Sequence, residues 1–403
     1  MCKKILFISD HGDPLAELGG KQSGGQNNYV KQLACALAER GLEVDVVTHW
    51  SDGDSPRIEP FGGSCRVVRI AAGRRGYVPK SEMVRLLPEF QREMHAILPL
   101  GDYDVVHTHY WMSGLIGLAL KREFGIPLIH TSHSLGIAKA KATGVKEEER
   151  LKAERQILEA ADRVIATTPT EKDMILDYTE GRSTISVIPI GVDEAFEKKQ
   201  AEPKTDRPLF AYAGRFEKTK GILTLLRGFR LFLRHGTDAH LILAGGAAED
   251  INPKSGLPVQ SKLRQAVAGI EDHVTFLGPL SQEELASLFT RATAAVVPSY
   301  YESFGMVAAE AQACGTPVIA SEVGGLQDVV QDGRTGLLVT ARNPAELSRA
   351  LRKLAADREL ADRLGKQAAQ RAKALFSWPS VAKAVHEVYE VLHGAEDPAF
   401  VGD

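Results

Sequence analysis

The sequence has few cysteines and no long apolar run. Its four cysteines, Cys2, Cys35, Cys65 and Cys314, form no CxxC pair and have no accompanying histidine cluster, which argues against a zinc site or a disulfide framework. No stretch approaches the roughly 20 apolar residues that a membrane-spanning helix requires, and the run Ile5–Ile8 is too short for a signal-peptide core. We therefore expect a cytoplasmic protein that binds no membrane.

The chain also lacks a strong excess of either charge. Its 49 Lys and Arg residues and 52 Asp and Glu residues leave a net charge of −3, so no overall positive field favours nucleic acid as a partner. Any site for an anion must therefore be built locally. A length of 403 residues with 44% hydrophobic side chains is typical of a globular protein with two domains.

Short apolar runs alternate with amphipathic helical segments along most of the chain. Helices are expected over Asn28–Arg40, Pro344–Lys373 and Trp378–His393. Strands are expected over Lys4–Ser9, Glu43–Thr48, Asp104–His107, Pro127–Thr131, Arg163–Thr167, Leu209–Ala213, His240–Ala244, His273–Leu277, Ala294–Pro298, Pro317–Ala320 and Gly336–Thr340. The alternation predicts an α/β fold of two Rossmann-like, doubly wound domains with parallel sheets.

A polar stretch, Glu194–Arg207, interrupts this alternation and lacks apolar periodicity. We interpret it as the linker between domains at residues 1–195 and 205–377. Ligands of doubly wound sheets lie beyond the carboxyl ends of the strands, so the two domains are predicted to share a cleft for their ligands.

Two glycine-containing loops follow expected strands. Gly24 and Gly25 end a loop before the first helix, where the backbone can approach a ligand and the helix N-terminus favours an anion, although a flexible surface loop has the same composition. The loop at residues 214–221 (GRFEKTKG) places Arg215 and Lys220 at a strand end. A guanidinium fork and an ammonium group suit phosphoryl groups, so this loop predicts a phosphate site.

The segment Ser299–Glu310 (SYYESFGMVAAE) combines backbone donors with two acids. The amides of Ser303–Gly305 would open a helix, where N–H groups lack partners. Glu302 and Glu310 would lie about two turns apart on nearly the same face, and carboxylates suit sugar hydroxyls. The alternatives are a favourable charge at a helix N-terminus for Glu302 and a solvated side chain for Glu310.

The segment at residues 107–114 (HTHYWMSG) ends another strand, where His107 or His109, with Tyr110 beside them, could hydrogen-bond a substrate. A histidine at a strand end is often only a structural residue whose ring nitrogens are hydrogen-bonded within the protein.

Two D-x-D pairs, at residues 52–54 and 102–104, could hold a divalent metal beside a diphosphate, but both lie among turn residues. We interpret both as structural and expect no metal or other cofactor.

Together these motifs resemble the retaining glycosyltransferases of the GT-B fold, which include sucrose-phosphate synthases, glycogen synthases and bacterial mannosyltransferases. The Gly-Gly loop, HTHY, GRFEKTKG and the pattern E-x7-E followed by GTPVIASEVGG carry the resemblance over nearly the whole chain. The stretch His133-Ser134-Leu135-Gly136, with Lys139, is most similar to the short bacterial and cyanobacterial sucrose-phosphate synthases. The inositol-phosphate N-acetylglucosaminyltransferases are the nearest alternative and are expected to carry Thr and Ala at positions 134 and 136.

The resemblance implies a role for each motif. The first domain would bind a phosphorylated acceptor, with the segment 378–403 packing back on it, and the second domain would bind the nucleotide sugar. Catalytic roles are implied for His109, Arg215, Lys220 and Glu302, donor contacts for Gly24, Gly25, Arg215, Lys220, Glu302, Ser303, Phe304, Gly305, Met306 and Glu310, and acceptor contacts for Lys80, Tyr110, Ser134, Lys139 and Arg150.

The implied reaction converts UDP-glucose and fructose 6-phosphate into sucrose 6-phosphate and UDP, with retention at the anomeric carbon. The UDP-sugar is then a substrate rather than a cofactor. The preference for UDP over ADP and the oligomeric state stay open. A hydrolase that releases UDP without an acceptor and a non-catalytic binding module are further alternatives. The presence of all four of Arg215, Lys220, Glu302 and Glu310 argues against the binding module.

Overall fold

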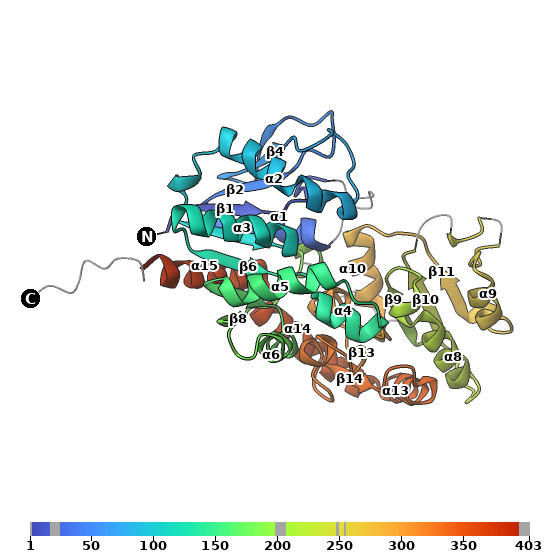
Figure 1. Ribbon diagram of the computed structural model, residues 1–403. Coiled ribbons are helices and arrows are strands. Elements are labelled where there is room, and N and C mark those ends of the chain that lie inside the picture. The colour runs from blue at the N-terminus through green and yellow to red at the C-terminus, as the bar shows by residue number, and fades with distance from the viewer. Residues whose placement is uncertain (1, 17–24, 198–206, 247–249, 254, 395–403) are drawn as a thin grey trace, which may run out of the picture. The chain divides into compact units, whose positions relative to one another are not determined.

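The computed structural model describes residues 2–16, 25–197, 207–246, 250–253 and 255–394 (Figure 1). The chain divides into two compact units. The first comprises Met1–Gly191 and Trp378–Asp403, and the second comprises Val192–Ser377. The fold prediction of two α/β domains with largely parallel sheets is confirmed.

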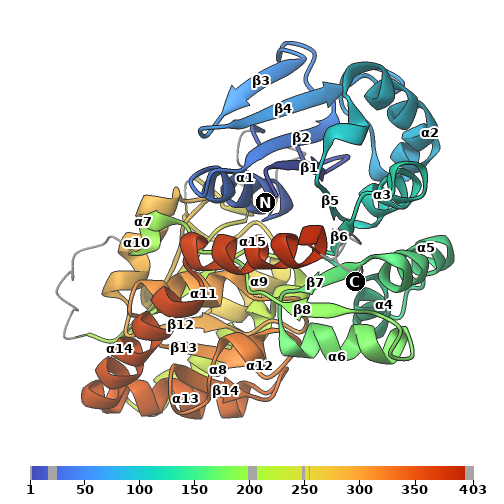
Figure 2. The same ribbon diagram turned by 90° about the vertical axis from the view of Figure 1, so that its left-hand side faces the viewer.

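The first unit is built on an eight-stranded sheet with the strand order β3-β4-β2-β1-β5-β6-β7-β8. Neighbouring strands pair in parallel, except that the edge strand β3 runs antiparallel to β4. Figure 2 shows this hairpin at the outer edge of the sheet. The strands are β1 (Lys4–Ile8), β2 (Glu43–His49), β3 (Ile58–Phe61), β4 (Cys65–Ile70), β5 (Val105–His109), β6 (Leu128–Thr131), β7 (Arg163–Ala166) and β8 (Ile185–Val187).

Seven α-helices of the described part of the chain belong to this unit: α1 (Gly25–Ala38), α2 (Lys80–Ile97), α3 (Trp111–Phe124), α4 (Gly136–Thr143), α5 (Glu148–Ala160), α6 (Pro169–Tyr178) and α15 (Trp378–Gly394). Helix α1 buries Val30, Leu33 and Leu37, whose spacing places them on one helical face. Helix α15 lies along α1 (Figure 2), with the Trp378 ring against the edge of Tyr29 at 5.6 Å between centroids. The last helix is thus part of the core of the first unit.

The second unit has a six-stranded, fully parallel sheet with the order β11-β10-β9-β12-β13-β14. Its core joins Phe210, Phe229, Phe232 and Leu351. The strands are β9 (Leu209–Ala213), β10 (His240–Ala244), β11 (Val274–Phe276), β12 (Ala294–Val297), β13 (Val318–Ser321) and β14 (Gly336–Val339). The helices are α7 (Glu194–Glu197), α8 (Ile222–Leu233), α9 (Ser261–Val267), α10 (Gln282–Arg291), α11 (Met306–Ala313), α12 (Leu326–Val329), α13 (Pro344–Ala356) and α14 (Arg358–Leu375).

Two sequence predictions about segment boundaries were wrong. Residues Glu194–Glu197 of the expected linker form α7 and bury Phe196, so the second unit begins at Val192. The expected helix over Pro344–Lys373 is two helices, because Asp357 accepts a hydrogen bond from the Leu360 amide and starts a new helix. Among the described residues, no helix is both long and apolar enough to cross a membrane.

Candidate active site

In the second unit, the loop after β9 and the loop after β12 are locked together. The Tyr300 amide donates to the Thr219 carbonyl at 2.8 Å. Gly221 has a φ of +70°, and a Cβ atom there would lie 1.8 Å from the Pro298 carbonyl oxygen. Only glycine permits this approach, so Gly221 fixes the position of Lys220 relative to the segment that carries Glu302.

Lys220 and Glu302 form an ion pair at this strand edge. The Lys220 ammonium donates to Glu302 Oε1 at 2.5 Å, and the Ser299 hydroxyl donates to the same oxygen at 3.1 Å. The two charged side chains are mostly buried, with 26% and 18% of their surfaces exposed. Glu302 Oε2 and two of the ammonium hydrogens have no partner among the described residues, which suits a ligand with both hydroxyl and anionic groups.

The chain then presents a run of unpaired backbone donors. The N–H groups of Ser303, Phe304, Gly305 and Met306 donate no hydrogen bond within the described part of the chain. Gly305 has a φ of +104° and starts α11, while the Phe304 ring anchors the segment by packing edge-on against Phe376. These amides are in place for the oxygen atoms of a ligand.

Glu310 lies in the first two turns of α11, whereas Glu302 precedes the helix. The prediction that the two acids share a helical face was therefore wrong, because the positive φ of Gly305 breaks the helical path between them. The half-buried Glu310 carboxylate has no hydrogen bond or ion pair among the described residues. Burial, and then the negative charge of Asp193, raise the pKa of Glu310 to about 7.

Arg215, the other predicted cation of this unit, is much less constrained. Its side chain is 74% exposed and forms an ion pair with Glu217 at 2.8 Å. The Arg215 carbonyl accepts a hydrogen bond from the Tyr212 hydroxyl, so the backbone of the loop is held while the guanidinium is not. A solvated pair of this kind is weak and is easily exchanged for another anion.

In the first unit, cations gather around Tyr110, which follows β5. The Lys80 ammonium lies 5.0 Å and the Arg150 guanidinium 5.1 Å from the Tyr110 ring centroid. Burial lowers the pKa of Lys80, and the charges of Arg150 and Lys139 lower it further against the attraction of Asp10. The structure therefore brings Lys80, Lys139 and Arg150 together with Tyr110, and the charges of Arg150 and Lys139 disfavour the charged form of Lys80.

Arg150 is held rigidly within this group. Its Nε donates to Glu154 at 2.7 Å and its Nη2 donates to the Ser134 carbonyl at 2.6 Å, while only 5% of its side chain is exposed. The Gly136 amide donates to both oxygens of Glu154, and a Cβ atom at this glycine would lie 2.9 Å from one of them. Ser134 thus contributes its carbonyl to the position of Arg150, and Lys139 pairs with Glu147 at 2.6 Å.

The histidines of the HTHY motif are buried. His107 bonds to the Tyr389 hydroxyl and to Thr131, so it has a structural role. His109 is fully buried, bonds through Nδ1 to His133 at 3.0 Å, and leaves Nε2 without a partner in the described part of the chain. Burial lowers the pKa values of His107 and His109 well below the usual value, so both are neutral at pH 7.

Backbone strain marks the same sheet edge. Tyr110 and His133, at the ends of β5 and β6, have φ values of +77° and +56°, which side-chain-bearing residues rarely adopt. Sequence analysis missed the supporting residues Asp10 and Ser113: the Ser113 hydroxyl donates to Asp10 at 2.5 Å, and Asp10 also contacts His11, whose ring meets the edge of Tyr110. No spacing in the sequence signals these contacts.

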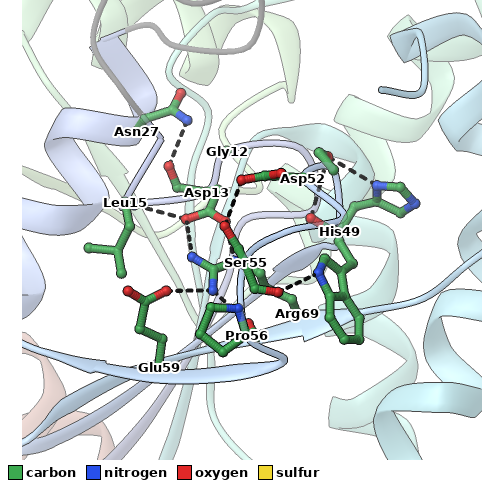
Figure 3. Close-up of polar contacts among 12 residues, drawn as sticks. Gly12, Asp13, Leu15, Asn27, His49, Asp52, Ser55, Pro56, Glu59 and Arg69 are labelled. Carbon is green, nitrogen blue, oxygen red and sulfur yellow. Dashed lines mark hydrogen bonds and ion pairs between the residues drawn. The ribbon is translucent and has the colours of Figure 1, made fainter. Parts of the chain in front are cut away.

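Gly25 is the first residue of α1, and Gly24 lies outside the described residues. The segment before this loop is held by a buried network (Figure 3). The Arg69 Nε donates to Asp13 at 2.6 Å, and its Nη1 donates to Glu59 and to the Pro56 carbonyl, both at 2.7 Å. The Asn27 side chain donates to the Asp13 carbonyl, so the network also anchors the first turn of α1.

Comparison with known proteins agrees with this arrangement. A family model described as glycosyl transferases group 1 matches residues 193–371, and a model described as glycosyltransferase family 4 matches residues 23–196. A D-inositol 3-phosphate glycosyltransferase of Paenarthrobacter aurescens is 36% identical over 405 residues, which cover 96% of this chain and 97% of the relative.

Solved structures of glycosyltransferases are also similar to this chain. The sucrose-phosphate synthase from Thermosynechococcus elongatus is 36% identical with a TM-score of 0.84, and the match covers 98% of this chain and 100% of that one. Anabaena Alr3699/HepE, solved in complex with UDP-glucose, has a TM-score of 0.70 at 19% identity, over 96% and 99% of the two chains, and so shares the fold. The chain therefore belongs to the GT-B glycosyltransferases.

Proposed function

We propose that this glycosyltransferase moves glucose from UDP-glucose to fructose 6-phosphate, with retention at the anomeric carbon, and releases sucrose 6-phosphate and UDP. The observation that carries the proposal is the group of cations around Tyr110. The charges of Arg150 and Lys139 disfavour the charged form of Lys80 in the free protein, and a phosphate dianion beside Lys80 would offset this effect. The first unit would thus hold the phosphorylated acceptor.

The second unit would hold the donor. Glu302 would accept a hydrogen bond from the 3-hydroxyl of glucose through its free oxygen, and the unpaired amides of residues 303–306 would bind other sugar hydroxyls. Glu310, which lacks a partner in the described part of the protein, would accept hydrogen bonds from the ribose hydroxyls. Lys220 and Arg215 would bind the diphosphate, and Gly24 and Gly25 are proposed as further donor contacts.

In the transfer itself, the bond from the anomeric carbon to the diphosphate oxygen breaks and a bond to the acceptor oxygen forms on the same face. The acceptor hydroxyl proton passes to the departing diphosphate oxygen. Negative charge grows on the diphosphate as its bond breaks, so Lys220 and Arg215 would act mainly in the transition state. The neutral, fully buried His109, with its free Nε2, would bind the glucose 6-hydroxyl without placing a charge beside the anomeric carbon.

A second candidate is transfer of N-acetylglucosamine from its UDP derivative to an inositol phosphate, because the P. aurescens relative carries such an acceptor in its name. The packing at Gly136 favours the fructose 6-phosphate proposal. A methyl group there would press on Glu154 Oε2 at 2.9 Å and on Arg150 Nε at 3.1 Å. The alanine expected in the inositol enzymes would therefore require Glu154 and Arg150 to shift in this protein.

The test is an incubation of the purified protein with each donor and each acceptor in all four combinations, together with incubations that contain unphosphorylated fructose or no acceptor. UDP release and the mass of the product are measured in each. The proposal requires sucrose 6-phosphate as the main product and little UDP release with unphosphorylated fructose. An inositol glycoside as the main product would establish the second candidate. UDP release without any acceptor would indicate a hydrolase.

A further inference from the structure

Two helices of the second unit form a groove lined by basic side chains. The groove has a volume of about 620 Å³ and lies between α8 and α9, with Pro344 at its end. Its cations are Arg227, Arg230, Arg234 and Lys262, and none of the described residues that line it is acidic. This volume falls within the range of about 300–1,000 Å³ that is usual for small-molecule sites.

The two helices that form the groove also lack acidic residues. Neither α8 nor α9 contains an Asp or a Glu, and the sequence from Lys218 to Thr237 has none. Arg227, Arg234 and Lys262 form no ion pair or hydrogen bond through their side chains with any described residue. A protein whose net charge is −3 thus concentrates uncompensated positive charge in one concave place.

Arg230 makes the groove rigid. Its Nη2 donates to the Ala266 carbonyl at 2.8 Å and to the Ala268 carbonyl at 2.7 Å, and so it ties α8 to the C-terminal end of α9. On the far side, Gly228 packs closely against α13, where a Cβ atom would lie 3.0 Å from the Pro344 carbonyl. The walls are therefore fixed, while the outer arginines remain free to bind.

The spacing of these arginines indicates the size of the ligand. Arg227 lies on α8 and Arg234 caps its C-terminal end, seven residues later, which separates their backbones by about 10 Å along the helix axis. When both side chains lie extended along the groove, two phosphates joined by a short carbon chain can each meet one guanidinium group. Between them the groove offers Leu223, Leu231 and Ala266 as an apolar floor for that chain.

We propose that this groove binds a small organic anion with two phosphate groups, at a site separate from the residues that handle the diphosphate of the donor. The probe is 1,6-hexanediol bisphosphate, which carries no sugar or base and so does not mimic the substrates. Hexyl phosphate and inorganic phosphate are the single-phosphate comparisons. Binding is measured by calorimetry on the full-length protein at constant ionic strength.

The test variant replaces Arg227 and Arg234 by Gln. The matched control replaces Arg349 and Arg352, two exposed arginines of α13 that do not line the groove, by Gln. All four positions are exposed, so both variants should melt close to the parent, and melting curves confirm that they are folded.

We expect the parent and the control to bind the bisphosphate at least about tenfold more tightly than hexyl phosphate, and the test variant to lose that preference. Equal binding by the test variant, or equal affinity for one and two phosphates, would overturn the proposal. Flotation with phosphatidylglycerol vesicles distinguishes a lipid surface from a free phosphate. Vesicle binding that disappears in the test variant, without bisphosphate binding, would assign the groove to membranes and refute the proposal.

Discussion

Replacement of Arg69 by Met should destabilise the first unit strongly. The Arg69 side chain is 2% exposed and its partners Asp13 and Glu59 are 13% and 36% exposed. Removal of one partner from a buried ion pair costs about 3–5 kcal/mol, because the remaining charge stays buried and uncompensated. Glu59 can rehydrate, and Asp13 keeps the hydrogen bond from the Leu15 amide, so we expect a loss near the lower end, about 3 kcal/mol.

The assay is thermal unfolding followed by near-ultraviolet circular dichroism. For a unit of this size, about 3 kcal/mol corresponds to a decrease in melting temperature of about 6–12 °C. The matched control is Arg57→Met, since Arg57 and its partner Glu93 are 43% and 44% exposed at 3.5 Å. An exposed pair contributes less than about 1 kcal/mol, so the control should melt within about 3 °C of the parent.

A second comparison separates the ion pair from loss of packing. If Asp13 depends on Arg69, then Asp13→Asn costs much less in the Arg69→Met background than alone. Hydrogen exchange at the first turn of α1 should also accelerate, because Asn27 donates to the Asp13 carbonyl. Melting of Arg69→Met as high as the control, or additive costs in the double variant, would refute the reasoning.

Four other predictions concern the proposed site and its surroundings. Lys220→Ala should lower kcat by about 10²–10³ with a smaller effect on donor KM, and an unchanged kcat would contradict its role. Arg150→Lys, which keeps the charge that Glu154 requires, should raise the KM for the phosphorylated acceptor about tenfold or more and leave the donor KM unchanged in steady-state kinetics. Because the pKa of Glu310 is about 7, donor affinity measured by calorimetry should weaken as the pH falls below 7, and Glu310→Gln should abolish this dependence. Burial lowers the pKa of His130 to about 3, so the unfolded chain binds a proton at this ring first as the pH falls below about 6.5. Melting scans should show about 2 kcal/mol less stability from this ring at pH 5 than at pH 7.

The strands of the second unit were predictable from the sequence because their chemistry is simple. The runs Leu209–Ala213 and His240–Ala244 are short, apolar and flanked by turn residues, and the structure has both with the same bounds. In contrast, β3 and β4 were missed. Pro60 interrupts β3, and β4 contains two arginines. Arg69 is buried there only because Asp13 and Glu59 neutralise it, and no local pattern contains that information.

In the proposed site, too, residues with a local sequence signal were predictable and residues that depend on distant contacts were not. Residues on the segments that follow a strand, such as Lys220 and Tyr110, could be proposed from the sequence because strand ends in parallel sheets carry ligand contacts. Supporting residues such as Asp10 and Glu154 were not found, since their contacts join segments that are distant in sequence. The prediction that Glu302 and Glu310 share a helical face was wrong for a different reason. Gly305 has a φ of +104°, and the helical periodicity of apolar residues in the sequence gives no indication of such a backbone conformation.

The side chain of Arg150 in the first unit is held in place, whereas that of Arg215 in the second unit is exposed. Substitutions at the two positions must therefore be interpreted differently. Arg150 is fixed by Glu154 and by a backbone carbonyl in the free protein, so its substitution should disturb folding as well as the acceptor binding that we propose for it. Arg215 has only the exposed Glu217 as an ion partner in the described structure, and its side chain must lose rotamer freedom when it binds an anion. Its substitution should leave the stability of the free protein unchanged and lower turnover alone. A fall in activity is therefore evidence for direct contact at Arg215, whereas at Arg150 it becomes evidence only after the melting temperature is shown to be preserved.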